Sequence, residues 1–289
     1  MNLELEDELG DIVQKARGRK PWSPADLARA VGMSAAEIGR IESCAWIPDA
    51  GALLKIAAAL DLHGPSLLAI AQKAWGPGEV TPEPGPFEIV CLDVFMGLYP
   101  VKCYLLVCRQ TGESSIIDTG GNPEAIIRKV RELNVKPTRI LLTHSHPDHA
   151  GGLGKLILQF GCPTFMDKKE PRPSGGREFH FLQDEEWIEV GRLKIQALFT
   201  PGHTPGGVSF KIGKSVFSGD AIFAGSMGRA NASWSGLFQS ITRRLLTLPE
   251  DTRLYPGHGP ATTVGEEKRH NPFFCGKIPV REPASAGLL

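Results

Sequence analysis

Residues 143–152 read Thr-His-Ser-His-Pro-Asp-His-Ala-Gly-Gly, and this stretch decides the fold. It follows an apolar run, residues 139–142, that predicts a β-strand. Within six residues it holds four side chains of metal-binding type, His144, His146, Asp148 and His149. Packing alone does not explain four such residues in one loop. Imidazole and carboxylate groups suit zinc, and also iron or manganese, so the stretch predicts a metal site and leaves the metal open.

Three more candidate ligands also follow predicted strands. His203 lies in the glycine-rich residues 200–207, Asp220 comes directly after the strand-like residues 215–218, and His258 lies in Tyr-Pro-Gly-His-Gly-Pro. Because each of these residues stands at a strand end, the loops can converge at one edge of layered sheets. The flanking glycines let the backbone turn tightly without a Cβ clash.

The composition of the chain changes once. Apolar residues recur at spacings of three and four over residues 3–75, which predicts helices. Residues 76–86 hold four prolines and three glycines and predict a semi-rigid linker. Short β-branched runs then alternate with helical stretches, which predicts an α/β layered domain. We therefore expect a helical domain over 1–75, the linker, and an α/β domain over 87–289.

The string His-x-His-x-Asp-His with the later His, Asp and His motifs resembles the metallo-β-lactamase superfamily across about residues 87–275. Residues 217–229 and 255–273 are similar to its short glyoxalase II-like (hydroxyacylglutathione hydrolase-like) branch, which hydrolyses glutathione thioesters. The resemblance implies an αββα sandwich. It also implies that His144, His146 and His203 hold one divalent ion, that Asp148, His149 and His258 hold a second, and that Asp220 bridges both.

Two divalent ions, zinc by preference, would share a water molecule and lower its pKa, so that hydroxide attacks the acyl carbon. Asp148 and Asp220 are the carboxylates expected to take part in catalysis, Asp148 by accepting a proton or orienting the nucleophile. Asp118 resembles the carboxylate of this family that supports the ligand loop. The competing interpretation of Asp118 is an aspartate that forms a turn.

The substrate is less well defined. Residues 230–234 depart from the usual pattern of the branch, and the chain resembles the short members that lack a glutathione-binding extension. Arg229, Lys268 and Arg269 are candidates to pair with substrate carboxylates. Solvated surface cations are the alternative interpretation of these three residues.

Residues 23–43 have the spacing of a helix, a glycine turn and a second helix, and residues 9–72 resemble the λ-repressor-like helix-turn-helix family. A DNA reader needs cations for phosphates, yet the expected recognition helix offers only Arg40. Over residues 1–75, eight Lys and Arg against ten Asp and Glu give 8 − 10 = −2. Lys15, Arg17, Arg19 and Lys20 form a local basic cluster. DNA binding is therefore possible, and packing or dimerisation is favoured.

The whole chain balances 32 Lys and Arg against 32 Asp and Glu, which does not favour an anionic partner. Its acidic start is unlike a signal peptide, and no apolar run approaches the ~20 residues of a membrane span. We expect a cytoplasmic metal-dependent hydrolase with a small acyl or thioester substrate. A homodimer is compatible with the sequence. Two alternatives are a mono-iron persulfide dioxygenase and a DNA-binding regulator whose metallo-domain senses a metabolite.

Overall fold

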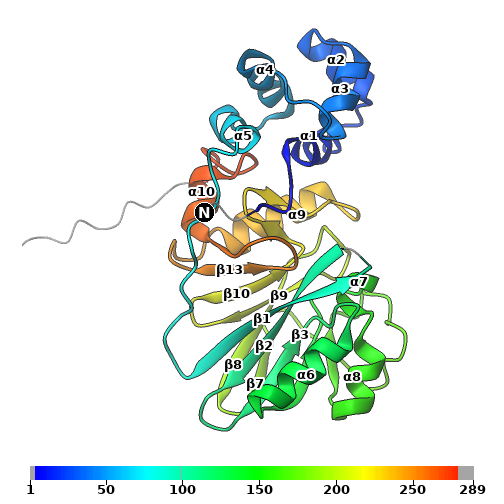
Figure 1. Ribbon diagram of the computed structural model, residues 1–289, viewed down its shortest axis with the longest axis vertical. Helices are drawn as coiled ribbons and strands as arrows, with labels where there is room; N and C mark the ends of the chain where they lie inside the picture. Colours follow the sequence, from blue (N-terminus) through cyan, green and yellow to red (C-terminus); the bar gives the residue numbers. More distant parts are fainter. Residues whose placement is uncertain (1–3, 98, 279–289) are drawn as a thin grey trace, which may run out of the picture.

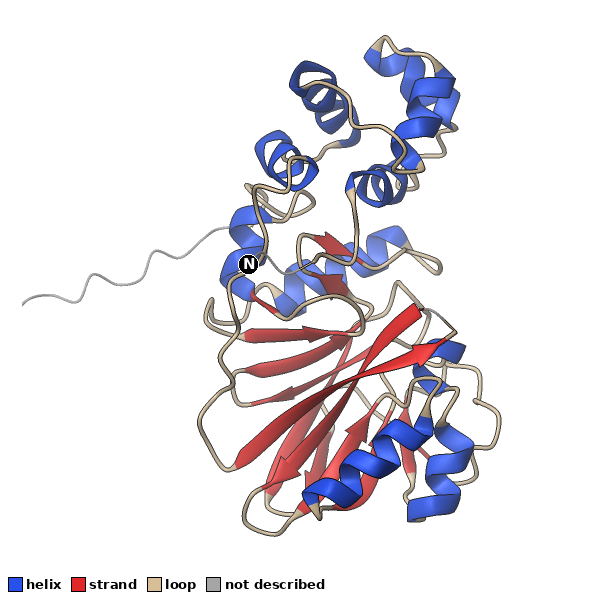
Figure 2. Ribbon diagram, in the orientation of Figure 1, coloured by secondary structure: helices blue, strands red, loops and turns tan. Residues whose placement is uncertain are grey.

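The computed structural model describes residues 4–97 and 99–278. The predicted domains 1–75 and 87–289 thus include residues outside the described range: 1–3, 98 and 279–289. Two six-stranded sheets stack on one another, and helices cover their outer faces (Figures 1 and 2). This arrangement confirms the predicted αββα sandwich preceded by a helical region.

The first sheet has the order β1-β2-β3-β4-β5-β6. Its strands are β1 (Phe87–Met96), β2 (Tyr99–Cys108), β3 (Glu113–Ile117), β4 (Lys136–Leu141), β5 (Thr164–Met166) and β6 (Phe179–Phe181). The pair β1–β2 is a long antiparallel hairpin, whereas β3, β4, β5 and β6 run parallel to one another. Parallel strands end at the same edge, so the loop after β4, which carries His144, opens at that edge.

The second sheet has the order β14-β13-β10-β9-β8-β7. Its strands are β7 (Trp187–Val190), β8 (Leu193–Phe199), β9 (Val208–Ile212), β10 (Ser215–Gly219), β13 (Arg253–Pro256) and β14 (Thr262–Thr263). Strands β10 and β13 are parallel, and their ends deliver Asp220 and His258. A separate two-stranded hairpin, β11 (Ile222–Phe223) and β12 (Ser226–Met227), follows Asp220 directly.

Each layer has its own apolar core. Tyr104, Phe210 and Phe217 are among the buried side chains between the two sheets. Helices α6 (Pro123–Leu133) and α8 (Leu153–Phe160) cover the first sheet. Helices α9 (Trp234–Ser240), η1 (Ile241–Leu245) and α10 (Val264–His270) cover the second sheet, and η1 is a π-helical turn that continues α9. The short α7 (Pro147–Ala150) carries Asp148 and His149.

Five helices precede the sandwich: α1 (Leu9–Arg17), α2 (Pro24–Val31), α3 (Ala35–Glu42), α4 (Ala50–Leu60) and α5 (Gly64–Ala71). Together with residues 4–8 and 72–75 they are called the helical unit below. Ser23 and Ser34 cap α2 and α3, because each hydroxyl accepts from a backbone amide of the first turn. Figure 1 places the helical unit beyond α9 and α10, away from the first sheet.

The predicted linker, residues 76–86, contains no helix or strand. It nevertheless lies against the second sheet, since Glu83 accepts from the backbone amide of Lys214 at 2.7 Å and Thr81 accepts from the Arg253 side chain at 2.5 Å. Among residues 4–97 and 99–278, no helix is long and apolar enough to cross a membrane.

Candidate metal centre

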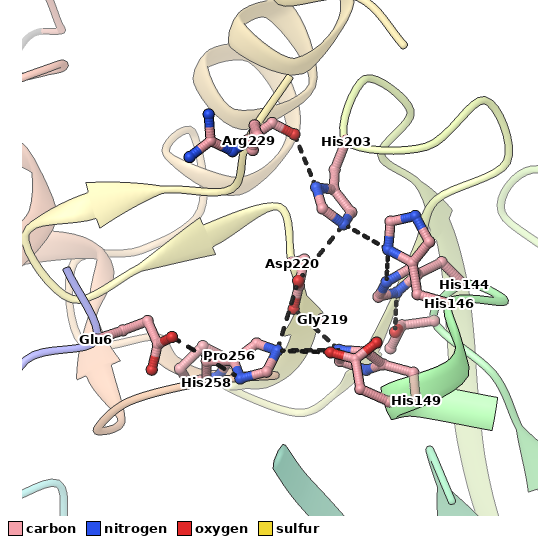
Figure 3. Close-up of polar contacts among 12 residues, drawn as sticks. Glu6, His144, His146, His149, His203, Gly219, Asp220, Arg229, Pro256 and His258 are labelled. Carbon is pink, nitrogen blue, oxygen red and sulfur yellow. Dashed lines mark hydrogen bonds and ion pairs between the residues drawn. The ribbon is translucent and has the colours of Figure 1, made fainter. Parts of the chain in front are cut away.

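All seven predicted ligands meet at one edge of the sandwich, where β4, β8, β10 and β13 end (Figure 3). The loops that follow these four strands are called the site edge below. Each loop leaves a strand whose side chains are buried, so the fold fixes the direction in which the loop starts. The loops of the site edge therefore start from the ends of largely buried strands.

The first group is His144, His146 and His203. Nε2 of His144 lies 3.0 Å from Nδ1 of His146, and Nε2 of His203 lies 3.1 Å from the same Nδ1 atom. These three nitrogen atoms face one another, and each can offer a lone pair to a cation. Three imidazole nitrogens in this arrangement form one face of a tetrahedral metal site.

The second group is Asp148, His149 and His258. Nε2 of His149 lies 3.3 Å from Nε2 of His258, and Oδ2 of Asp148 lies 3.4 Å from Nε2 of His258. Oδ2 of Asp148 is 3.8 Å from Nε2 of His149. The group supplies two nitrogens and one carboxylate oxygen, a set that also suits a divalent cation.

Asp220 lies between the two groups. Its Oδ2 atom is 3.4 Å from Nε2 of His203, and its Oδ1 atom is 3.3 Å from Nε2 of His149. Oδ1 is buried and makes no hydrogen bond of acceptable geometry. A Cβ atom on Gly257 would lie 2.4 Å from Oδ1, so only glycine leaves this oxygen its space. A buried carboxylate oxygen without a hydrogen bond is costly unless a cation neutralises it.

Hydrogen bonds on the far side of the rings orient the imidazoles. Nδ1 of His149 donates to Oδ2 of Asp118 at 2.9 Å, and Nδ1 of His203 donates to the carbonyl of Arg229 at 2.7 Å. Nδ1 of His258 donates to the carbonyl of Pro100 at 3.0 Å. Carbonyl and carboxylate oxygens can only accept, so in each neutral ring the Nε2 lone pair faces the centre.

Asp118 ties two parts of the site edge together. Besides its contact with His149, it accepts from the backbone amide and from the hydroxyl of Thr143, each at 2.8 Å. The Thr143 hydroxyl in turn lies 3.1 Å from Nδ1 of His144. Asp118 is buried and has a positive φ of 56°. This geometry supports a role in orienting the ligands more than it supports a simple turn.

Burial and neighbouring charges set the protonation of the centre. Burial, reinforced by His149, lowers the pKa of His144 well below its usual range, and burial lowers the pKa of His203. Burial opposes the charge on Asp220, but attraction to His149 outweighs it and holds the pKa of this carboxyl well below its usual range. Burial also opposes a charge on His149 and His258, but attraction to Asp220 and Asp118 raises the pKa of His149, and the hydrogen bond with Asp148 raises the pKa of His258. A cation bound at the second group would therefore displace protons from these two rings, because imidazole binds metal ions in its neutral form.

Glu170 escaped the sequence predictions although it connects two of the ligand loops. Its Oε2 atom accepts from the amide and the hydroxyl of Ser145, at 2.8 and 2.7 Å, and its Oε1 atom accepts from the amide of Gly206 at 2.8 Å. Ser145 lies between His144 and His146. A lone glutamate in a polar segment gave no signal in the sequence, because its partners are 25 and 36 residues away.

The three cations proposed for substrate binding lie in different surroundings. Arg229 is exposed, and its guanidinium donates to Gln14 of α1 at 2.6 Å. Lys268 is buried and lies 4.0 Å from Glu250, and Arg269 pairs with the same carboxylate at 2.9 Å. Lys268 and Arg269 thus pair with Glu250, and Arg269 also lies 3.8 Å from Glu266. Of the three cations, Arg229 is joined to the centre through its carbonyl oxygen, which accepts from His203.

The comparisons with known proteins agree with this geometry. The profile of the metallo-beta-lactamase superfamily matches residues 96–258, and that of a helix-turn-helix domain matches residues 8–69. The "Probable metallo-hydrolase YqgX" of Bacillus subtilis is 35% identical over 203 residues, which cover 63% of this chain and 96% of that protein. The "Hydroxyacylglutathione hydrolase GloC" of Haemophilus influenzae is 33% identical over 195 residues, which cover 60% and 92%.

A solved structure gives the same result in three dimensions. TTHA1623, described in a di-iron-bound form, is 33% identical and superposes with a TM-score of 0.56 over 63% of this chain and 99% of that one. The family profile spans more than half of this chain, and the seven side chains meet where its sheets end. The chain belongs to the metallo-β-lactamase superfamily and carries a helix-turn-helix domain before the catalytic fold.

Proposed function

We propose that this protein is a hydrolase that holds two divalent cations and cleaves a thioester or a related acyl bond. The observation that carries the proposal is the position of Asp220 between two ligand groups, with a buried Oδ1 atom that lacks a hydrogen bond. One cation would lie among His144, His146 and His203, and the other among Asp148, His149 and His258. Asp220 would be shared by the two cations.

The residues fit such a pair of cations on three counts. The pKa values of His144 and His203 are lowered, the carboxyl of Asp220 is ionised, and Gly257 leaves room at the shared oxygen. Two divalent cations at this site would lower the pKa of a water molecule towards neutrality and polarise the carbonyl of the substrate. Zinc fits the ligand set, and the di-iron form of TTHA1623 supports iron as well.

The side chains of the centre have separate tasks in this proposal. The Asp148 side chain is 25% exposed, whereas that of Asp220 is 9% exposed, so Asp148 is the carboxylate that meets entering water. It orients the attacking water and can take its proton. Asp220 holds the two ligand groups together. A thiolate leaves without a strong general acid, which agrees with a centre that offers none.

The acyl thioester as substrate rests on the branch of the family. GloC, which is named a hydroxyacylglutathione hydrolase, supports it, and YqgX is named only a metallo-hydrolase. Glutathione itself is the weaker part of the proposal, because two of the three candidate cations, Lys268 and Arg269, pair with Glu250. We therefore propose an acyl thioester as the reacting group and leave its carrier open.

The test is a substrate panel measured on protein loaded with zinc or iron. S-lactoylglutathione, acetyl-coenzyme A, a short thioester, a lactone and glutathione persulfide are compared, with Asp220→Ala as the inactive control. We expect hydrolysis of at least one thioester, lost after chelation and in the control variant. Oxygen consumption with the persulfide, without thioester cleavage, would overturn the proposal in favour of a mono-iron dioxygenase.

A further inference from the structure

The helical unit and the catalytic sandwich share one hydrophobic core. A single cluster of buried side chains includes residues from both, among them Leu9, Ile12, Ile70, Ile222, Met227 and Leu237. Gly225, at the tip of the β11–β12 hairpin, is closely covered by Trp75 and Ile70, because an added Cβ atom would lie 2.7 and 3.1 Å from them. The tip of the hairpin thus packs directly against α5 and the residue Trp75 that follows it.

A buried ion pair joins α1 to this hairpin. Lys15 pairs with Asp7, and each side chain is 7% exposed. Nζ of Lys15 also donates to the carbonyl of Met227 at 2.9 Å, and the hydroxyl of Ser226 donates to Asp7. These four residues, Asp7, Lys15, Ser226 and Met227, are called the latch. A buried pair that loses one partner leaves an uncompensated charge, so the latch holds only as a whole.

The hairpin held by the latch is part of the metal centre. It begins directly after Asp220 and ends just before Arg229, whose carbonyl orients His203. Between them Gly228 lies so close that an added Cβ atom would be 1.8 Å from the carbonyl of Asp220. A displacement of the hairpin would therefore move the bridging carboxylate and one imidazole together.

The N-terminal segment reaches the second ligand group as well. Oε1 of Glu6 lies 4.0 Å from Nδ1 of His258 (Figure 3). Gly259 packs against the backbone of Glu6, because an added Cβ atom would lie 3.0 Å from the Glu6 amide nitrogen. The segment thus touches the loop that carries His258, while the latch touches the loop that carries Asp220.

We propose that the helical unit is a fixed brace of the metal centre, in which Lys15 and Asp7 are positioning residues for Asp220 and His203. The inference rests on the proposed two-cation site. It gives the helix-turn-helix fold of this chain a task that does not require DNA. The helical unit closes the back of the β11–β12 hairpin with a charged pair made by Lys15 of α1 and by Asp7, which precedes α1.

The test compares Lys15→Met with Arg19→Gln, a matched change in the same helical unit. Arg19 pairs with Asp61 on the surface, where the two side chains are 41% and 56% exposed. Hydrogen exchange of residues 222–229 is measured in the metal-free full chain, and zinc affinity is measured by competition with a chelator. We expect Lys15→Met to speed exchange of the hairpin at least tenfold and to weaken zinc binding about 10–100-fold, with Arg19→Gln unchanged.

Wild-type exchange and zinc affinity in folded Lys15→Met would overturn the brace. Because the unpaired Asp7 charge can unfold this variant, the double variant Asp7→Asn/Lys15→Met removes both charges. We expect this double variant to fold and to keep wild-type hydrogen exchange in β8 and β9, while its hairpin still exchanges rapidly. Slow hydrogen exchange of the hairpin in the double variant would also overturn the brace. A wild-type chain that binds no zinc would refute the two-cation site instead, and the exchange comparison would still report on the latch.

Discussion

The site edge and the helical unit both contain clusters of polar side chains that stand close together in the sequence, but the two regions differ in how many of these groups find partners within the chain. At the site edge the fold satisfies the outer nitrogen of His149, His203 and His258 and leaves the inner nitrogen facing a shared space. In the helical unit, the cations of the basic cluster pair with carboxylates and carbonyl oxygens of the same chain. A polar side chain is thus available to an external partner only where the fold gives it no partner within the chain.

The basic cluster shows this most clearly. Arg17 makes a two-pronged pair with Glu42, with distances of 2.5 and 2.8 Å, and Arg19 pairs with Asp61 at 2.5 Å. Lys20 donates to the carbonyl of Ala59 and lies 4.0 Å from the Trp22 ring. Lys15 belongs to the latch. Cations held in this way contribute little to neutralising DNA phosphates, so the comparison favours the brace over a DNA reader.

The largest expected effect is at the bridge between the ligand groups. Asp220→Asn keeps the size of the side chain and removes its charge. We expect thioester hydrolysis to fall to the uncatalysed background, well beyond the roughly 10–100-fold loss typical of outer hydrogen-bond partners. Steady-state kinetics and metal content measure it. Activity within tenfold of the wild type would show that the centre does not depend on the bridge.

The next effect concerns the carboxylate behind His149. Asp118→Asn can still accept from Thr143 but offers His149 a neutral partner, so we expect metal affinity or kcat/KM to fall by about 10–100-fold. Chelator competition and kinetics check it. An unaltered affinity would restore the interpretation of Asp118 as a turn residue.

A smaller and more selective effect is expected at Glu170. Glu170→Gln replaces a carboxylate that accepts three hydrogen bonds by an amide with one acceptor, so the loops of His144 and His203 lose their common support. We expect a loss of about tenfold in affinity, confined to the first ligand group. Metal titration with two resolved steps measures it, and equal weakening of both steps would contradict the assignment.

The smallest effects belong to the helical unit away from the latch. Arg17→Ala leaves the nearly buried Glu42 carboxylate unpaired and should cost roughly 3 kcal/mol of unfolding free energy. Arg19→Gln removes an exposed pair and should cost about 0–1 kcal/mol. Urea unfolding measures both, and neither change should alter kcat of the folded, metal-loaded protein. The contrast between the site edge and the helical unit would be wrong if the wild type bound a random DNA duplex tightly, in a salt-dependent way, and Arg17→Ala abolished this binding.

Local pattern accounts for most of what the sequence predicted. The apolar run 139–142 overlaps β4 (Lys136–Leu141), and the strand-like residues 215–218 lie within β10 (Ser215–Gly219), because alternation and turn residues act over short distances. The ligand types at the site edge could be read in the same way, since each follows a strand. These features require no knowledge of distant partners.

Long-range contacts account for what the sequence left open. Lys268 and Arg269 were proposed by charge alone, and their pairing with Glu250 depends on how α10 packs. The latch joins Lys15 to Met227, 212 positions away, and Asp7 to Ser226, 219 positions away. Neither the burial of Lys15 nor its partners could therefore be foreseen from the sequence. From the sequence alone we counted Lys15 among the cations available to DNA, but the fold buries its side chain beside Asp7.

The most direct measurement of the central claim is anomalous X-ray scattering from crystals of the chain soaked in zinc. We predict two peaks a few Å apart, one among His144, His146 and His203 and one among Asp148, His149 and His258, with an oxygen of Asp220 in contact with both. A single peak, or peaks that do not touch Asp220, would contradict the two-cation centre.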